Sequence, residues 1–377
     1  MNMYANEMNN SCLEVDLGAL RENARRAGQS LSGSAAVIPV LKGDAYGLGL
    51  VPCARALAAL PGIGMFAVAH VSEALRLREA GIAQELLVLG NPLPAALEAG
   101  AAADVTFTVG RPGLLPELAE CAGRLGRAVK AELKLDTGLH RVGAAPGDEF
   151  ALLLDELRRA GERVELRGIY SHFADTADEA RCAAQYALYL QGLDQAERAG
   201  FAAPRRHICD SAASELYPQY HLDAVRLGRR LIMDNPIAPL GGVTEPASWR
   251  TFITDVRRRA AGDSLGYGGA FTLPSDALVA TLGVGYGDGL PPALAEAHGE
   301  VLVGGRRARL LTCCMDQCLA DVTGLACAVG DEVTIFGRDA AGNFLSAQET
   351  AAVYGGNEGC AITTALSPRV ARRYLNG

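Results

Sequence analysis

The chain has 377 residues and a formal net charge of −8, and 49% of its residues are hydrophobic. This length exceeds one typical domain, so we expect two domains of an ordinary globular protein. The negative charge argues against a nucleic-acid partner, because nucleic-acid phosphates require a basic surface. No run approaches the ~20 uninterrupted apolar residues that span a bilayer, so we expect no membrane partner.

Ten cysteines are scattered along the sequence. Cys313, Cys314 and Cys318 cluster, but their spacing matches no familiar zinc site, and we expect no metal. The polar start of the sequence lacks the basic and apolar regions of a signal peptide. We therefore expect reduced thiols in a cytoplasmic protein.

Apolar runs and amphipathic segments alternate through the first two-thirds of the chain. The runs, each predicted to be a strand, lie near residues 36–42, 65–70, 85–90, 104–110, 129–136, 164–173, 205–209 and 224–232. The segment 71–81 is typical of the helical stretches, since apolar residues such as Leu77 alternate with charged ones such as Glu73. Eight strands alternating with helices predict a (β/α)8 barrel over residues 13–236, although a doubly wound open sheet fits the same alternation.

The pattern changes after Asn235-Pro236. Short apolar alternations, separated by glycine-containing turns, follow near residues 278–285, 300–303, 308–313 and 332–336. They predict an all-β domain over residues 244–377. The Pro- and Gly-rich segment 237–243 is the predicted linker.

Lys42 follows the apolar run 36–41, and a glycine-containing turn comes directly after it. An ammonium group is costly to bury because it loses its hydration. A lysine at the mouth of a strand is therefore either a ligand for phosphate or carboxylate, or an amine that is deprotonated for Schiff-base chemistry.

Barrel enzymes carry their active sites at the carboxyl ends of the strands, and phosphate is often bound after strands seven and eight. Five residues fall at such positions in the predicted barrel: Lys42, His172, Ser211, Arg226 and Gly228. The predicted fold therefore gathers them at one end of the barrel.

Longer motifs resemble the alanine racemase family, whose members are pyridoxal-phosphate (PLP) enzymes with an N-terminal barrel and a C-terminal β domain. The motifs are Lys42-Gly-Asp-Ala-Tyr-Gly-Leu-Gly49, Lys134-Leu-Asp-Thr-Gly-Leu-His-Arg141, Gly266-Tyr-Gly-Gly269, Gly285-Tyr-Gly-Asp-Gly289 and Cys314-Met-Asp-Gln-Cys318. The resemblance covers nearly the whole chain. It implies interconversion of L- and D-alanine to supply D-alanine for the cell wall.

The resemblance also implies two bases, one for each face of the substrate. Lys42 matches the lysine that forms a Schiff base with PLP and serves one face, and Tyr267 matches the tyrosine that serves the other. His172 matches the histidine that stabilises the tyrosine phenolate. Arg226 matches the arginine that faces the pyridine nitrogen, and His207 could sit beneath the cofactor.

The remaining implied contacts concern the phosphate, the substrate and the partner subunit. The residues that resemble phosphate ligands are Tyr46, Ser211 and Gly228. Arg141 and the backbone N–H of Met315 resemble the groups that receive the substrate carboxylate. Lys134 matches a lysine that is often carbamylated, which would orient Arg141. Tyr286 resembles a residue at the substrate entrance, and both it and Tyr267 would come from the partner of a homodimer.

Two positions depart from the family pattern. Cys360 stands where the family usually has a tyrosine that binds the phosphate, and Met233-Asp-Asn235 replaces a Leu-Tyr-Gly type turn. The first departure leaves room for a longer substrate side chain, so racemisation of serine or a broader set of amino acids is a close alternative. A PLP-binding protein without catalysis and a PLP decarboxylase are further alternatives.

Overall fold

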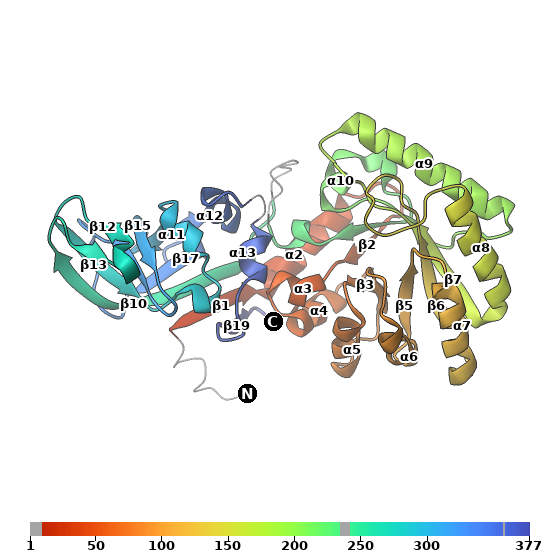
Figure 1. Cartoon of the computed structure of the whole chain (residues 1–377), viewed down its shortest axis with the longest axis horizontal. Helices are drawn as coiled ribbons and strands as arrows, with labels where there is room; N and C mark the ends of the chain where they lie inside the picture. Colours follow the sequence, from red (N-terminus) through yellow and green to blue (C-terminus); the bar gives the residue numbers. More distant parts are fainter. Residues whose placement is uncertain (1–9, 234–241, 357–358) are drawn as a thin grey trace. The chain divides into compact units, whose positions relative to one another are not determined.

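The computed structural model describes residues 10–233, 242–356 and 359–377 (Figure 1). The chain divides into two compact units. The parallel unit comprises Arg21–Ala45 and the described part of Leu50–Val243. The antiparallel unit comprises residues 10–20, Tyr46–Gly49 and the described part of Thr244–Gly377. Asp234, Asn235 and most of the predicted linker 237–243 lie outside the described residues.

The strands of the parallel unit fall where the apolar runs predict them. Six form one parallel sheet in the order β3 (Met65–Val68), β4 (Glu85–Val88), β5 (Val105–Val109), β6 (Val129–Lys134), β7 (Val164–Tyr170) and β8 (Arg206–His207). A further parallel pair joins β2 (Ala36–Pro39) to β9 (Ala224–Leu227). A bridge between Val40 and Ala67 links β2 to β3, but closure into a (β/α)8 barrel stays a prediction.

Helices lie outside these strands, as Figure 1 shows for α7 beside β6 and β7. The helices that precede or alternate with the strands are α2 (Leu17–Gln29), α4 (Leu50–Ala58), α5 (Val71–Glu79), α6 (Pro94–Ala102), α7 (Leu114–Leu125), α8 (Asp148–Ala160), α9 (Glu179–Arg198) and α10 (Ser211–Leu216). Every residue of β3 and of β9 is buried, so continuous apolar runs, rather than alternating ones, mark these strands.

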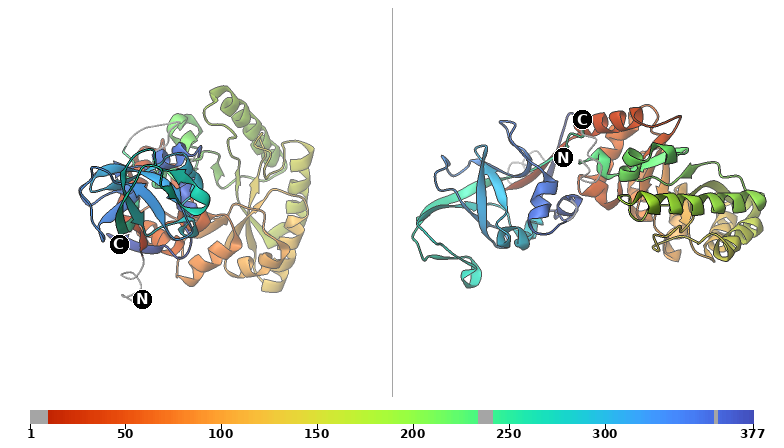
Figure 2. Two further views of the ribbon diagram at one scale, coloured as in Figure 1. Left: turned by 60° about the vertical axis from the view of Figure 1, so that its left-hand side comes forward. Right: turned by 90° about the horizontal axis from the view of Figure 1, so that it is seen from above.

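The antiparallel unit is a barrel of antiparallel strands (Figure 2). The ring runs β17 (Glu332–Arg338), β14 (Glu300–Val303), β15 (Arg306–Cys313), β16 (Cys318–Asp321), β13 (Ala277–Leu282) and β10 (Ala247–Arg259), and β17 closes it by pairing with β10. Short elements complete the unit: β11 (Ser264–Leu265), β12 (Phe271–Thr272), β18 (Phe344–Leu345), α11 (Pro292–Glu296), α12 (Ala347–Val353) and α13 (Cys360–Thr364).

The first strand of the chain belongs to this second sheet. β1 (Ser11–Asp16) pairs antiparallel with β10 and parallel with β19 (Ala371–Leu375). Leu13 and Val15 are fully buried there. The predicted barrel boundary at residue 13 therefore includes residues whose strand lies in the antiparallel sheet.

Within the described residues, no helix is both long and apolar enough to cross a membrane.

Candidate active site

Lys42 opens a turn with an uncommon backbone conformation. The turn is α3 (Lys42–Tyr46), in which Gly43 has φ 64° and Asp44, Ala45 and Tyr46 have φ between 55° and 56°. Positive φ values strain residues other than glycine and persist only when the surroundings enforce them. Strain of this kind clusters at functional sites, which favours a functional role for the turn.

The Glu73 carboxylate on α5 holds this turn in place. Its Oε1 accepts the N–H of Gly43 at 2.7 Å and that of Asp44 at 3.3 Å. Its Oε2 accepts the N–H of Ala69 at 2.8 Å and that of His70 at 3.3 Å. Glu73 is only 8% exposed, although the amphipathic pattern of 71–81 predicts a charged outer face there. One carboxylate thus joins the turn after β2 to the turn after β3.

Arg226, in β9, donates hydrogen bonds to two histidines. Its Nη1 lies 2.6 Å from Nδ1 of His207, and its Nη2 lies 2.9 Å from Nδ1 of His172. Nη2 also donates to the carbonyls of Ser171 and Ile208. Because the guanidinium can only donate, each histidine must accept at Nδ1 and carry its own proton on Nε2. His207 then donates a hydrogen bond from Nε2–H to Glu132 Oε2 at 2.8 Å.

His172 is neutral in this setting. Burial, together with the positive charge of Arg226, Lys134, Arg141 and Lys42, holds its pKa well below the ordinary value of 6.5. Its Nε2–H is therefore a hydrogen-bond donor at neutral pH, and the acid Asp210 lies 4.0 Å from that nitrogen.

Lys134 ends β6 beside the same cluster. Burial and the charges of Arg226, Arg141 and Lys42 lower its pKa to about 7 from 10.5. Its ammonium lies 5.5 Å from the ring centre of Tyr170, against which Arg226 also packs at 5.2 Å. A substantial fraction of Lys134 is therefore an uncharged amine at neutral pH.

A carboxylate arranges the loop that leads from Lys134 to Arg141. Asp136 Oδ1 accepts three backbone N–H groups, from Gly138, Leu139 and His140, at 2.9, 3.1 and 3.0 Å. This local network sets the path of the chain into Arg141.

Ser211 and Gly228 meet across the ends of β8 and β9. The Ser211 hydroxyl oxygen accepts the N–H of Gly228 and that of Arg230, each at 3.2 Å. With both lone pairs used, its O–H is left to donate to a further acceptor.

The antiparallel unit presents three of the predicted site residues at its surface. Tyr267, in the short helix Tyr267–Gly269, is 84% exposed, and Met315 and Tyr286 are about half exposed. The Tyr286 N–H donates to the Cys314 carbonyl at 3.0 Å. Gly285 is required beside it, because a Cβ there would lie 2.4 Å from the Met315 carbonyl oxygen.

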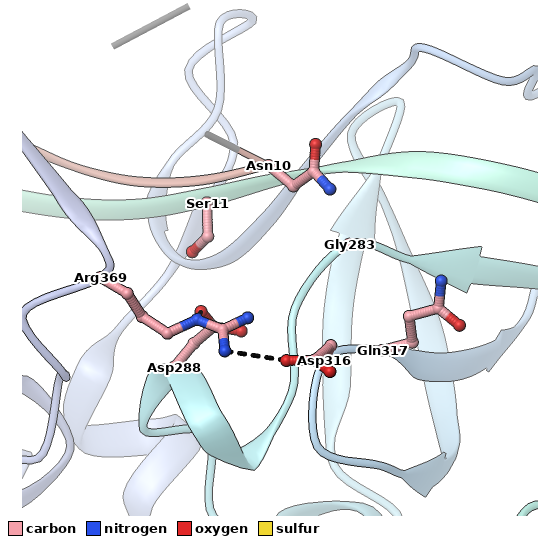
Figure 3. Close-up of a pocket in the computed structure, with 7 residues that line it drawn as sticks. All are labelled: Asn10, Ser11, Gly283, Asp288, Asp316, Gln317 and Arg369. Carbon is pink, nitrogen blue, oxygen red and sulfur yellow. Dashed lines mark ion pairs between the residues drawn. The ribbon is translucent and has the colours of Figure 1, made fainter. Parts of the chain in front are cut away.

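Arg369 is ion-paired to Asp288 and Asp316, one in each of the loops that carry Tyr286 and Met315 (Figure 3). Arg369 Nε binds Asp288 Oδ1 at 2.7 Å, and its Nη1 binds Asp316 Oδ1 at 2.8 Å. Asp288 in turn accepts the N–H of Gly285 at 2.8 Å. These groups line a pocket of about 250 Å³ whose lining is mainly polar.

The sequence matches the family model "Alanine racemase, N-terminal domain" over residues 15–236 and "Alanine racemase, C-terminal domain" over residues 247–374. An alanine racemase of Desulforamulus reducens is 35% identical, covering 86% of this chain and 89% of its own. One of Frankia casuarinae is 34% identical, covering 97% and 96%. The crystal structure of alanine racemase from D-cycloserine-producing Streptomyces lavendulae superposes with a TM-score of 0.91 at 31% identity, covering 98% of each chain. The chain belongs to the alanine racemase family.

Family membership confirms the resemblance that the sequence motifs predicted. The positive charges of Lys42, Lys134, Arg141 and Arg226 all act on His172 and lower its pKa. The Ser211 hydroxyl oxygen accepts the N–H of Gly228. Tyr46 ends the turn that Lys42 begins. Tyr267, Tyr286 and Met315 lie in the antiparallel unit. Cys360 is buried at the start of α13.

Sequence reasoning did not single out four residues that organise this family site: Glu73, Glu132, Tyr170 and Arg369. Tyr170 had a readable signal, because it is the last residue of β7 and precedes His172 by two residues. Glu132 likewise precedes Lys134 by two. Glu73 and Arg369 had no such signal in the sequence, because a charged side chain on an amphipathic helix or near a terminus is usually exposed to solvent.

Proposed function

We propose that the chain racemises alanine with PLP as its cofactor, supplying D-alanine for the cell wall. The observation that carries the proposal is the set of basic side chains around His172 in a chain of this family: Lys42, Lys134, Arg141 and Arg226. So much positive charge at the carboxyl ends of barrel strands suits an anionic ligand and the carboxylate of its substrate.

The donor set fits PLP. Lys42 supplies a primary amine, and the Ser211 hydroxyl and Tyr46 supply donors for a phosphate. The Gly228 N–H, which now binds the Ser211 oxygen, would turn to the phosphate when it is bound. PLP, when bound through Lys42, supplies an electron sink that makes the substrate α-proton acidic. Arg226 would face the pyridine nitrogen and, because it holds its own proton firmly, would leave that nitrogen unprotonated, which would weaken the sink and favour return of the proton to the α-carbon.

Two residues exchange the α-proton in this proposal. Lys42 removes or returns it on one face, and Tyr267 of the partner subunit does so on the other. A phenol needs help to act as a base near neutral pH. The Nε2–H of neutral His172, fixed by the Arg226 hydrogen bond to Nδ1, stabilises the phenolate by donating to it.

Arg141 and the Met315 N–H receive the substrate carboxylate, and Tyr286 lines the entrance. Lys134, as an uncharged amine, takes up CO2 to give a carbamate and releases a proton. The new anion would neutralise part of the local positive charge and orient Arg141. The lowered pKa of Lys134 supports this modification, because only the free amine reacts.

A homodimer completes the site. The support is the 84% exposure of Tyr267 together with the half-exposed Tyr286 and Met315, which leaves these side chains accessible to a partner subunit. We also propose a cytoplasmic location, which suits the free thiols of the nine cysteines from Cys12 to Cys327.

The strands of the parallel unit close into a (β/α)8 barrel in this proposal. The bridge from Val40 to Ala67 and the Arg226 N–H bond to the Cys209 carbonyl support this closure.

Serine is a second candidate substrate. Buried Cys360 replaces the usual phosphate-binding tyrosine, which removes a bulky side chain.

Chiral chromatography of PLP-loaded protein, incubated separately with L-alanine and L-serine, tests both candidate substrates. D-Alanine as the dominant product supports the proposal, and comparable D-serine makes the enzyme a broader racemase. Neither product, with PLP still bound, would leave a PLP-binding protein without racemase activity. Release of CO2 from basic amino acids would instead indicate a decarboxylase.

A further inference from the structure

Cys313 and Cys318 lie opposite one another in a tight hairpin. They are paired residues at the ends of β15 and β16. The Cys314 N–H donates to the Gln317 carbonyl at 2.8 Å, which closes a turn whose two central residues are Met315 and Asp316. The next pair outward, Cys313 and Cys318, is therefore a non-hydrogen-bonded pair.

This kind of pair brings two cysteines within bonding range. Directly opposed residues in a non-hydrogen-bonded pair have Cα atoms about 4.5 Å apart and side chains on the same face. Disulfides form between cysteines whose Cα atoms are roughly 4.4–6.8 Å apart. The two residues can therefore be joined without a large movement of the backbone.

The two thiols already interact, and they differ in access. The Cys318 thiol donates a hydrogen bond to the Cys313 sulfur, which lowers the pKa of Cys313. Cys318 is fully buried, whereas Cys313 is partly exposed. Cys313 is thus the thiol that meets an oxidant first, and Cys318 is placed to resolve it.

We propose that Cys313 and Cys318 form a reversible oxidation site that closes to a disulfide across the hairpin. The oxidant is a hydroperoxide. The Cys313 thiolate attacks the peroxide oxygen, giving a sulfenic acid and, from hydrogen peroxide, hydroxide. The Cys318 thiol then attacks that sulfur, the S–S bond forms and water leaves. Two thiols are oxidised by two electrons, and one peroxide is reduced to two molecules of water.

The disulfide would act on the turn that it brackets. That turn carries Met315, and its backbone is bound by the N–H groups of Tyr286 and Gly287. Cross-linking the base of the hairpin fixes the position of the Met315 N–H. The effect on catalysis, unlike the disulfide itself, rests on the proposed function. Oxidation changes KM for alanine several-fold while PLP stays bound.

Peptide mapping tests the site without reference to activity. The full-length protein is treated with hydrogen peroxide, its free thiols are alkylated, and it is digested with trypsin and an enzyme that cleaves before aspartate. Trypsin alone leaves Cys313, Cys314, Cys318 and Cys327 on one peptide, because no lysine or arginine lies between Arg309 and Arg338. Cleavage before Asp316 and Asp321 separates peptide 310–315 from peptide 316–320. The expected result is a linked pair of these peptides that dithiothreitol separates.

Cys314→Ser is the matched control, since Cys314 lies next to Cys313 and is also partly exposed. The linked peptide should persist in Cys314→Ser and be lost in Cys313→Ser and in Cys318→Ala. Persistence in Cys313→Ser would overturn the proposal, because Cys314 would then be the reacting thiol. Recovery of both peptides fully alkylated after peroxide treatment would overturn it as well. An unchanged KM in a protein that does form the disulfide would contradict only the link to catalysis.

Discussion

Glu73 accepts the backbone N–H of Gly43 at 2.7 Å, so a buried side chain of α5 fixes the residue next to Lys42. The same carboxylate has both oxygens occupied by pairs of N–H donors. This arrangement holds a strained, left-handed turn in the conformation that presents the proposed catalytic lysine.

Replacing Glu73 by glutamine should loosen that turn. The amide puts an NH2 group against two N–H donors, and each buried donor left unsatisfied costs roughly 1–3 kcal/mol. We expect a loss of about 2 kcal/mol in the free energy of unfolding, slower reaction of Lys42 with added PLP, and a lower kcat. Stopped-flow absorbance and thermal unfolding measure these effects. Glu79→Gln, on the exposed side of the same helix, is the control. An unchanged rate of PLP binding would show that Glu73 does not position Lys42.

Tyr267→Phe should separate the two proposed bases. The variant keeps the visible absorption of bound PLP, because Lys42 is intact, but it cannot take or return a proton on its own face. We expect one enantiomer of alanine to exchange its α-hydrogen with deuterated water far more slowly than the other. Lys42→Ala, by contrast, should lose the absorption band. Full activity of Tyr267→Phe would refute the two-base assignment.

Carbamylation of Lys134 should depend on pH. With a pKa lowered to about 7, Lys134 is mainly an ammonium below that pH and a free amine above it. The carbamate signal in carbon NMR with labelled bicarbonate should therefore grow as the pH rises through about 7. Lys134→Gln should lack the signal, and Lys130→Gln, four residues earlier on β6 and ion-paired to Asp104, should keep it. A signal independent of pH would contradict this prediction.

The same shift predicts a pH-dependent stability of the PLP-free chain in the absence of CO2. Between pH 7 and 10.5 the unfolded chain binds a proton at Lys134 that the folded chain does not, so stability rises with pH across that window. Lys134→Met should remove this rise, which denaturant titrations at several pH values would measure.

Arg369→Met should disturb substrate binding more than chemistry. The change breaks the bonds to Asp288 and Asp316 and frees the two loops that carry Tyr286 and Met315. We expect KM for alanine to increase while kcat changes little. Arg257→Met, at an exposed ion pair with Asp255, should leave both unchanged. A fall in kcat with constant KM would contradict the positioning role.

The strands could be predicted from sequence because they are buried on both faces. Met65–Val68 is a continuous apolar run, Val105–Val109 is buried along its whole length, and the observed strands begin within one residue of the predicted starts. The predicted ends extend too far, as at 224–232, where β9 ends at Leu227 and a short helix over Arg229–Leu231 follows.

The site was only partly predictable for a different reason. Lys42 and His172 carry their chemistry in their side-chain type and in recognisable motifs. Glu73 and Arg369 act through contacts with segments that are distant in sequence, and a one-dimensional charge pattern does not distinguish a buried carboxylate from a solvated one. The placement of β1 was missed likewise, because its pairing partners begin more than 200 residues later.

That placement has a consequence for synthesis on the ribosome. The strands that flank β1 are β10 and β19, and both follow the whole parallel unit along the chain. The apolar side chains of Leu13 and Val15 therefore stay exposed to solvent until the chain that follows the parallel unit has been made. β1 is thus made before the parallel unit but paired only after it, and an exposed apolar strand of this kind is a binding site for a chaperone.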